Sequence, residues 1–393
     1  MSRLEELIQE LCPNGVEYKT IDELCYVLTG GEAPDDSIKE KEPDDTHIYP
    51  IYSNGIGENA LWGYSSEYRV DVKSVTFSSI GTIGYPTLRE PKFTPIIRLK
   101  VLYPKDDKVL NISFLKYALE IVEFKQQKSS LPNINANMIK EIKIPVPPME
   151  VQCEIVHILD QFTLLTAELT AELTARKQQY QYYLDWLYEN CGGEVRSLDE
   201  IGVFTRGKRF VHADAVEKDG VPCVHYGELY TYYGVYANKT KSQIRKSILE
   251  EKTLRYAKNG DVIIVGAGEN DEDIGIGVAW EGNYDVAVHD ACYTFVSNEN
   301  PKFISFYLRS SSYHKQIKPF VSRGKICAIS AQGIGKAKLK VPTLEEQQRI
   351  VSQLEQFDAY CNDLTQGLPA EIELRRKQYE YYRDKLLSFK ELK

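Results

Sequence analysis

The chain repeats itself at an offset of almost half its length. The segment PMEVQCEIVHILDQF at 148–162 aligns with TLEEQQRIVSQLEQF at 343–357, an offset of 195 residues. The similarity resumes with RKQQYQYY at 176–183 and RRKQYEYY at 375–382, at an offset of 199, so the second copy has four additional residues in between. A duplication of this kind predicts two units of one fold, each a globular region followed by the same tail.

The repeat also covers the start of each globular region, where residues 19–24 match residues 196–201. The globular regions contain short β-branched or aromatic runs bounded by Gly, Asn and Asp, such as 261–265, 286–288 and 292–296, which indicate strands. One helix is predicted to close each region, at 112–127 and at 302–317. The expected class is therefore α+β, with two mixed domains of short strands and helices, and the expected organisation is domain 1–147, helix 148–190, domain 191–342 and helix 343–393.

Both tails are predicted to be long helices. Their apolar residues recur at steps of three, four and seven, which is typical of one continuous helical face. A helix over about 150–188 would be close to 57 Å long at about 1.5 Å per residue. Because such a helix needs another helix against its apolar face, we expect the tails to form an antiparallel pair. The predicted interface consists of Ile155, Leu159, Phe162, Leu169, Leu173, Tyr180 and Tyr183 in the first tail and Ile350, Leu354, Phe357, Leu364, Tyr379 and Tyr382 in the second.

The two tails differ in one stretch. Gly367, Leu368 and Pro369 interrupt the second tail at the four-residue insertion, where Gly suits the residue after a helix end and Pro the first position of a new helix. We expect a break there. The first tail instead contains a tandem Thr-Ala-Glu-Leu repeat at 166–173 and no breaker.

Charge is distributed unevenly along the chain. The formal net charge of −9 argues against a nucleic-acid partner when it is taken over the whole chain, since phosphate binding usually leaves a basic surface. However, residues 1–46 alone carry −9, whereas 47–147 carry +4 and 191–342 carry +3. Residues 302–340 hold nine Lys or Arg and no acid, and 261–299 hold nine acids and no base. Such segregation allows a positive face on one side.

Basic residues in both globular regions alternate with Ser, Asn, Tyr and Gly, which can contact phosphates and base edges. For each of them the alternative is an ordinary solvated surface residue, and for His225 it is a hydrogen-bonded core histidine. The candidate DNA contacts are Tyr52, Ser53, Asn54, Lys128, Ser129, Ser130, Asn133, Arg206, Lys208, Arg209, His225, Tyr226, Lys239, Lys241, Arg323 and Lys325.

Motifs of catalytic chemistry are missing from the sequence. The run from Gly333 to Ala337 lacks both the leading glycine and the Ser or Thr of a phosphate-binding loop. No Asn/Asp-Pro-Pro-aromatic tetrapeptide occurs, although an adenine methyltransferase needs one to hold the flipped base. The eight cysteines form no Cys-x-x-Cys pair and no Cys/His cluster, so we expect buried free thiols and no metal site.

The start of the chain carries Glu5, Glu6 and Glu10, where a signal peptide would have a basic start and an apolar stretch. No run of 18 apolar residues occurs in the sequence. We therefore expect a cytoplasmic protein.

Two mildly basic globular regions alternate here with two helices bearing Pro-x-x-Glu-x-Gln-x-x-Ile-Val and Gln-Tyr-x-Tyr-Tyr. This arrangement resembles the specificity subunit of type I restriction-modification enzymes over the whole chain. The resemblance implies two target recognition domains that each read one half of a split, asymmetric site in double-stranded DNA. It also implies a coiled coil that separates the domains and binds two methyltransferase subunits, with motor-nuclease subunits joining for restriction. The chain itself would be non-catalytic, and S-adenosylmethionine, ATP and Mg²⁺ would bind to its partners.

The length of the tail gives a further hypothesis. Removing one Thr-Ala-Glu-Leu unit would shorten the helix by ~6 Å, nearly two base-pair steps at about 3.4 Å each. The unspecified gap in the DNA site would then change while both half-sites stay the same.

Two alternatives remain open from the sequence. One is a stand-alone DNA-binding regulator, which would bind DNA specifically without partners. The other is a structural coiled-coil adaptor, which would leave the basic segment 302–340 unexplained.

Overall fold

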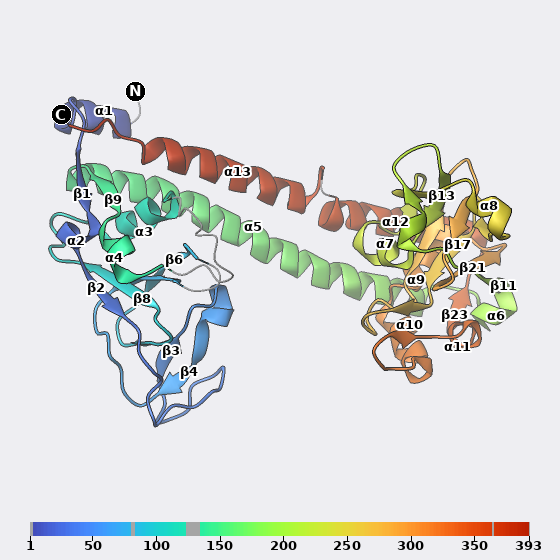
Figure 1. The fold of residues 1–393 in the computed structure, drawn as a ribbon. Coiled ribbons are helices and arrows are strands. Elements are labelled where there is room, and N and C mark those ends of the chain that lie inside the picture. The colour runs from blue at the N-terminus through green and yellow to red at the C-terminus, as the bar shows by residue number, and fades with distance from the viewer. Residues whose placement is uncertain (1–2, 80–82, 123–133, 364, 393) are drawn as a thin grey trace. The chain divides into compact units, whose positions relative to one another are not determined.

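The computed structural model describes residues 3–79, 83–122, 134–363 and 365–392. The chain divides into two compact units, Met1–Glu168 with Ile372–Lys393, and Leu169–Glu371. Each unit contains one globular domain and part of the long helices (Figure 1). The helix predicted over about 150–188 is α5, Met149–Asn190, which begins in the first unit and ends in the second.

The first globular domain is built on a four-stranded antiparallel sheet of order β2-β8-β5-β6 and a three-stranded sheet of order β4-β3-β7. Antiparallel pairing of β1 with β9 joins the start of the domain to its end. The elements are α1 Arg3–Leu11, β1 Glu17–Thr20, α2 Ile21–Leu24, β2 Cys25–Thr29, β3 Tyr49–Tyr52, β4 Leu61–Ser65, β5 Ser74–Phe77, β6 Pro86–Arg89, β7 Thr94–Pro95, β8 Lys100–Pro104, α3 Ile112–Glu120, α4 Ala136–Lys140 and β9 Lys143–Val146.

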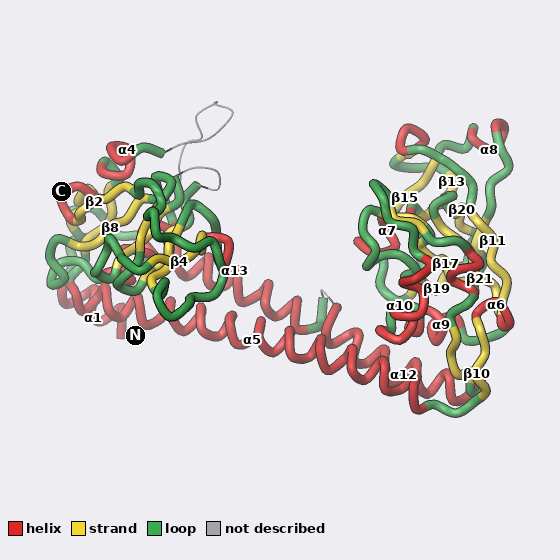
Figure 2. The backbone as a smooth tube through the Cα atoms, turned by 90° about the horizontal axis from the view of Figure 1, so that it is seen from below, coloured by secondary structure: helices red, strands yellow, loops and turns green. Residues whose placement is uncertain are grey.

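The second globular domain has two five-stranded sheets, of order β11-β21-β17-β19-β14 and β12-β15-β13-β20-β16 (Figure 2). Its strands are β10 Glu194–Ser197, β11 Gly202–Arg206, β12 Ala215–Val216, β13 Val221–Val224, β14 Tyr236–Ala237, β15 Ser242–Ile244, β16 Tyr256–Ala257, β17 Val262–Val265, β18 Ala267–Gly268, β19 Gly277–Trp280, β20 Val286–Val288, β21 Cys292–Ser297, β22 Cys327–Ala328 and β23 Lys338–Val341. Its helices are α6 Leu198–Ile201, α7 Tyr226–Thr231, α8 Ile248–Glu251, α9 Pro301–Tyr307, α10 Ser311–Ile317 and α11 Ala331–Gly335.

The two domains share one topology. The antiparallel order β2-β8-β5-β6 corresponds to β11-β21-β17-β19, and the parallel pair β3 and β7 corresponds to β13 and β20. A capping box opens the first short helix of each domain, between Thr20 and Glu23 and between Ser197 and Glu200. The expected α+β class and the duplication are thus confirmed at the level of strand pairing.

The long helices pack antiparallel within each unit. Phe162 of α5 stacks on Tyr382 in the first unit, and Tyr183 of α5 stacks on Phe357 in the second. The second tail is divided into α12, Leu344–Asn362, and α13, Leu368–Leu386. The predicted break is therefore confirmed, and Gly367 is required there because a Cβ would lie 2.6 Å from the Ala359 carbonyl oxygen.

The single helix predicted over 302–317 is wrong. Two helices, α9 and α10, occupy this stretch because Ser310 begins a new helix, its hydroxyl accepting a hydrogen bond from the Tyr313 N–H at 3.2 Å. Asp185 of α5 accepts another from the Ser311 N–H at 2.7 Å. The helix predicted over 112–127 ends earlier than expected, at Glu120, and residues 123–127 lie outside the described part of the chain.

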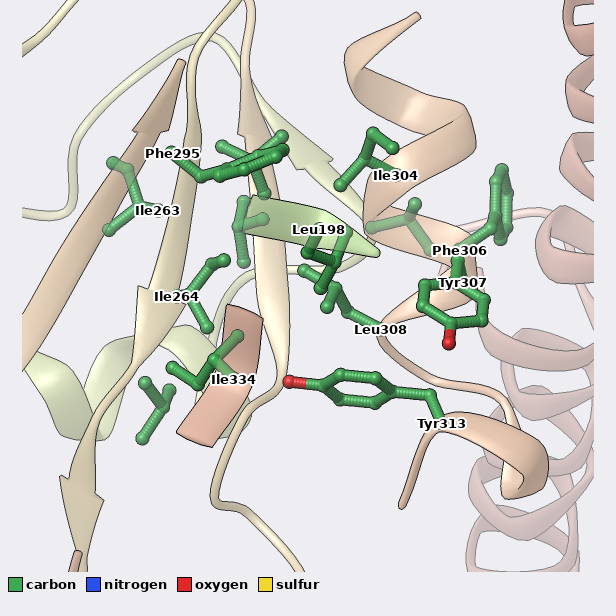
Figure 3. Close-up of a cluster of buried hydrophobic side chains, with 14 of the residues drawn as sticks. Leu198, Ile263, Ile264, Phe295, Ile304, Phe306, Tyr307, Leu308, Tyr313 and Ile334 are labelled. Atoms are coloured by element: carbon green, nitrogen blue, oxygen red, sulfur yellow. The ribbon is translucent and has the colours of Figure 1, made fainter. Parts of the chain in front are cut away.

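The core of the second domain lies between the sheet of order β11-β21-β17-β19-β14 and the helices α9 to α11 (Figure 3). Ile264 and Phe295 point from β17 and β21 toward side chains of α9, whereas Ile263 points to the other face of the sheet, and all three are nearly inaccessible to solvent. Burial of each such side chain stabilises the fold by about 1.5–3 kcal/mol. Seven of the eight cysteines are buried free thiols and only Cys153 is exposed, so that expectation was correct for all but one.

Among the described residues, none of the helices is both long enough and apolar enough to cross a membrane.

Candidate nucleic-acid interface

One short turn in each domain connects the sheet that contains β3 and β7, or β13 and β20, to the sheet that contains β8 or β21. It joins β7 to β8 through residues 96–99 in the first domain and β20 to β21 through residues 289–291 in the second. We call both the inter-sheet turn. Because β3 runs parallel to β7 and β13 parallel to β20, the loop after β3 or β13 leaves the sheet at the same end as the turn. The sequence candidates 52–54 and 225–226 lie at these two loops.

Hydrogen bonds occupy the backbone of the first inter-sheet turn. The N–H groups of Ile97 and Arg98 donate to the carbonyls at 30–31, at 2.8 and 3.0 Å. The Asn54 amide donates to the Ile97 carbonyl, and the Ser79 hydroxyl donates to the Arg98 carbonyl at 2.9 Å. The side chain of Asn54, a candidate DNA contact, therefore stabilises the turn that lies next to it.

The second inter-sheet turn contacts the loop that follows β11. Arg206 donates from Nε to the Asp290 carbonyl at 2.7 Å, and the Lys208 N–H donates to the Val288 carbonyl at 2.9 Å. The residue between them is Gly207, where a Cβ would lie 2.3 Å from the Val288 carbonyl oxygen. The basic loop 206–209 can approach the turn this closely only because it contains a glycine.

Two imidazole rings pack against each other at this turn, tilted by 40°. His225 and His289 lie 4.3 Å apart between ring centroids, and Phe210 packs on His289 at 5.0 Å. The Ala291 N–H donates to His289 Nδ1 at 3.1 Å. The proton of His289 is therefore on Nε2, which donates to the Phe210 carbonyl, also at 3.1 Å. Burial, followed by the neighbouring imidazole, lowers the pKa of His289 to about 4, and burial also lowers the pKa of His225. Both rings are consequently neutral near pH 7.

Two further basic residues join the loop 206–209. Arg255 donates to the Arg206 carbonyl at 2.6 Å, and Lys252 donates to the Arg209 carbonyl at 2.8 Å. Arg206, Lys208 and Arg209 are all exposed. Lys252 and Arg255 are not among the residues predicted from the sequence. They lie 43 and 49 residues from these partners, and no local pattern indicates the contact.

A pocket of about 400 Å³ lies between Arg206, Asp290, Ser322 and Ser330, so the loop that contains Arg323 starts next to the inter-sheet turn. Lys325 of the same loop is exposed.

Part of the segregated charge is neutralised inside the domain. Arg323 forms an ion pair with Asp271 at 2.7 Å, and Lys302 forms one with Glu281 at 3.2 Å. The basic segment 302–340 therefore packs in part against the acidic segment 261–299. The positive face is confined to fewer residues than the sequence suggests.

The remaining candidates fall into three places. Arg89 lies 3.8 Å above the ring of Tyr52, and the Ser53 N–H donates to the Ala60 carbonyl at 2.8 Å. Lys239 and Lys241 are exposed on the loop between β14 and β15. Four candidates lie outside the described residues: Lys128, Ser129, Ser130 and Asn133.

The helix interface contains the same aromatic stack twice. Phe162 and Tyr382 lie 5.5 Å apart, and Tyr183 and Phe357 lie 5.2 Å apart, each pair at an interplanar angle of 24°. Of the other predicted interface residues, Ile155, Leu159, Ile350 and Leu354 are buried, Leu169, Leu173, Tyr180 and Tyr379 are half-buried, and Leu364 lies outside the described residues.

A buried glutamine attaches each helix to its domain. Gln152 accepts a hydrogen bond from the Asn111 N–H at 2.8 Å, and Gln347 accepts one from the Asn300 N–H at 2.9 Å. Both amides also donate to a proline carbonyl that precedes the helix, and both side chains are inaccessible to solvent. The paired glutamines of the repeat thus make equivalent contacts.

No group of three or more His, Cys, Asp or Glu side chains suited to a metal ion occurs within the residues that the structure describes. The described surface offers cationic loops, a pocket and neutral imidazoles. This chemistry suits recognition of a polyanion.

The duplicated fold matches one protein family twice. Residues 13–176 and 192–374 each match the type I restriction modification DNA specificity domain. The chain belongs to this family, and it is a non-catalytic DNA specificity subunit with two target recognition domains.

Relatives of the same kind match almost end to end. The chain is 29% identical to the EcoR124I/EcoR124II specificity subunit of Escherichia coli, over 90% of each chain. It is 28% identical to a putative type I specificity subunit of Haemophilus influenzae, over 98% of each chain. The specificity subunit from M. genitalium has the same fold, with a TM-score of 0.52 at 15% identity over 95% of this chain and 96% of that one. A chain solved in a study of type I complex assembly matches at a TM-score of 0.62 and 14% identity, over 96% and 98%.

Proposed function

We propose that each recognition domain reads one half of a split, asymmetric site in double-stranded DNA, and that the helices set the gap between the half-sites. We assign the domains to 1–147 and 191–342, and the helices to 148–190 and 343–393. The observation that carries the proposal is the inter-sheet turn, which occurs once in each domain beside exposed or uncompensated cations.

The candidate DNA contacts are proposed with different roles. Lys208 and Arg209 contact phosphates, since both are exposed and their loop is stabilised by backbone hydrogen bonds. The residues at 52–54 and 225–226 lie beneath or beside the turn and position it. Lys239, Lys241 and Lys325 contribute charge around the site, whereas the charge of Arg323 is compensated by Asp271. Lys128, Ser129, Ser130 and Asn133 stay candidate DNA contacts.

The helices are proposed to bind two methyltransferase subunits. Tyr182 and Tyr381 occupy equivalent positions of the repeat, and their exposed fractions are 65% and 62%. Exposed aromatic side chains of this kind are enriched where proteins associate. Two equivalent aromatic positions support two copies of one partner. Motor-nuclease subunits would complete the restriction complex. S-adenosylmethionine, ATP and Mg²⁺ would all be bound by these partners, in the cytoplasm where the DNA is.

The proposal is tested by sequencing the methylome of a host that expresses this chain together with its methyltransferase. We expect methylated adenines in one bipartite sequence with a constant gap, and none when this chain is omitted. Methylation at sites without a common bipartite sequence would contradict the proposal. If the purified chain alone binds one DNA sequence as tightly as the complex does, a stand-alone regulator is favoured instead.

A further inference from the structure

Two consecutive residues at the first inter-sheet turn have an unusual backbone conformation. The φ angles of Ile97 and Arg98 are 52° and 60°, in the left-handed region. For a residue other than glycine this conformation costs roughly 1–2 kcal/mol, and for a β-branched residue such as isoleucine it is a genuine outlier. It persists only where the surroundings impose it, and such positions cluster at functional sites.

The surroundings do impose it here. Both N–H groups and both carbonyls of Ile97 and Arg98 are hydrogen-bonded to residues on three other segments, near 30, 54 and 79. The Leu99 N–H closes the turn on the Ile96 carbonyl at 3.0 Å. All the backbone polar groups of the pair are therefore used inside the domain. Only the two side chains are available to a ligand, and the isoleucine is 51% exposed at this apex.

The turn lies among cations that have no carboxylate partner within the described residues. Lys100 is only 5% exposed and donates to the Thr29 hydroxyl at 3.1 Å, and burial lowers its pKa, followed by the charge of Arg98. The half-buried Arg89 stacks on Tyr52, and burial lowers its pKa as well. Within the part of the chain described, no ion pair joins Arg89, Arg98 or Lys100 to a carboxylate. Uncompensated cations at a partly buried site favour binding of a polyanion.

We infer that Arg98 reads a guanine through the major groove and that Ile97 contacts the neighbouring base pair. The inference rests on the proposed function and names a specificity-determining residue within it. The guanidinium fork matches O6 and N7 of guanine, and an apolar side chain suits a thymine methyl group. A fixed backbone allows one arginine to distinguish bases, because the position of its side chain relative to the DNA is set in advance.

The test uses the complex of this chain with its methyltransferase subunits and a set of duplexes in which each recognised base pair is replaced in turn. In the Arg98→Lys variant the charge stays but the fork is lost, so discrimination at one G·C pair of one half-site should fall by about 10- to 100-fold. Discrimination between bases in the other half-site should not change. Its preservation also shows that the variant complex is folded. The matched control is Lys108→Ala, which changes an exposed cation beyond the opposite end of β8.

Replacing the affected guanine by 7-deazaguanine, which lacks the N7 acceptor, should weaken binding of the unmodified complex but not of the Arg98→Ala complex, which has no donor at this position. Equal weakening of all duplexes by Arg98→Ala, with unchanged base preference, would assign Arg98 to a phosphate and overturn the inference. Sensitivity to inosine but not to 7-deazaguanine would place the turn in the minor groove and also overturn it. If the unmodified complex shows no base preference at any position, the proposed function itself fails.

Discussion

The inter-sheet turns of the two recognition domains connect equivalent strands but differ in backbone conformation and in side chains: Ile97 and Arg98 have positive φ angles, and no residue of 289–291 does. A glycine follows the first central strand in both, Gly30 after β2 and Gly207 after β11, and at each a Cβ would contact the backbone of the strand before the turn. The turn of the first domain contains isoleucine and arginine at 97–98, whereas that of the second contains His289 and Asp290. One strand arrangement can thus carry turns of different chemistry: other segments hold the backbone of the first turn, whereas the side chain of His289 helps to hold the second.

The supporting residues differ in the same way. The first turn depends on an amide and a hydroxyl, from Asn54 and Ser79. The second depends on a packed pair of imidazoles and on the guanidinium of Arg206. The two domains should therefore respond differently to pH and salt although they share a topology.

The largest expected effect concerns what the domains have in common. Gln152→Leu should destabilise the first domain, and Gln347→Leu the second, by about 3 kcal/mol or more, because each change leaves several buried polar groups without a partner. Hydrogen exchange of β5 and β8 against β17 and β21 would show which domain opens. Gln353→Leu, at an exposed position of α12, is the control and should have little effect. Loss of protection in both domains with either variant would show that they are not separately attached.

The second prediction separates the domains by pH. The pKa of His289 is about 4 when folded and near 6.5 when unfolded, so the unfolded state binds more protons between these values. Stability is therefore full above about pH 6.5 and is lost as the pH falls toward 4, by about 2 kcal/mol, in the second domain only. Denaturant unfolding followed at pH 7 and pH 4.5 would measure this.

In the first domain the pKa of Asp44 is lowered to about 2 by hydrogen bonds from His47, so this carboxylate stays ionised over the same range. A His289→Gln variant should flatten the pH dependence of the second domain. An unchanged slope would show that other histidines of this domain with a lowered pKa, His225 or His314, control it.

A smaller effect is expected on DNA binding. Lys208→Ala and Arg209→Ala should each weaken binding about equally for all sequences and reduce the slope of log affinity against log salt by about one. In the first domain, Arg89 and Lys100 are less exposed than Lys208 and Arg209. Titrations at several salt concentrations would measure the slopes, with Lys108→Ala as the control. A change in base preference by Lys208→Ala would mean that this loop reads bases.

The smallest effect on the domains themselves is expected from shortening α5. Deleting Thr170–Leu173, one Thr-Ala-Glu-Leu unit, makes the helix ~6 Å shorter. The gap in the methylated site should therefore change by nearly two base pairs, and both half-sites should stay the same. Methylome sequencing would reveal both. Altered half-sites would show that the domains do not read DNA independently of the helix.

Local patterns in the sequence were sufficient for much of the fold. The stripe of the first tail predicted α5 to within two residues at each end, and glycine followed by proline predicted the break before α13. The pattern failed at 302–317, since apolar spacing does not show that one helix ends at Tyr307 and that Ser310 begins another. Of the proposed interface, the candidates at 52–54, 206–209 and 225–226 all lie near the inter-sheet turns. Ile97 and Arg98 were missed, because nothing in their composition indicates a left-handed backbone.

The sequence by itself therefore determined the duplication, the long helices and the family, because repeats and helical periodicity are local properties of a chain. Only the tertiary structure brings together the residues of the proposed recognition surface. One of its contacts joins Asn54 to Ile97, 43 residues apart, and another joins Arg206 to Asp290, 84 residues apart. Such contacts depend on strand pairing that brings distant loops to one end of a sheet, and no local pattern specifies which loops will meet there.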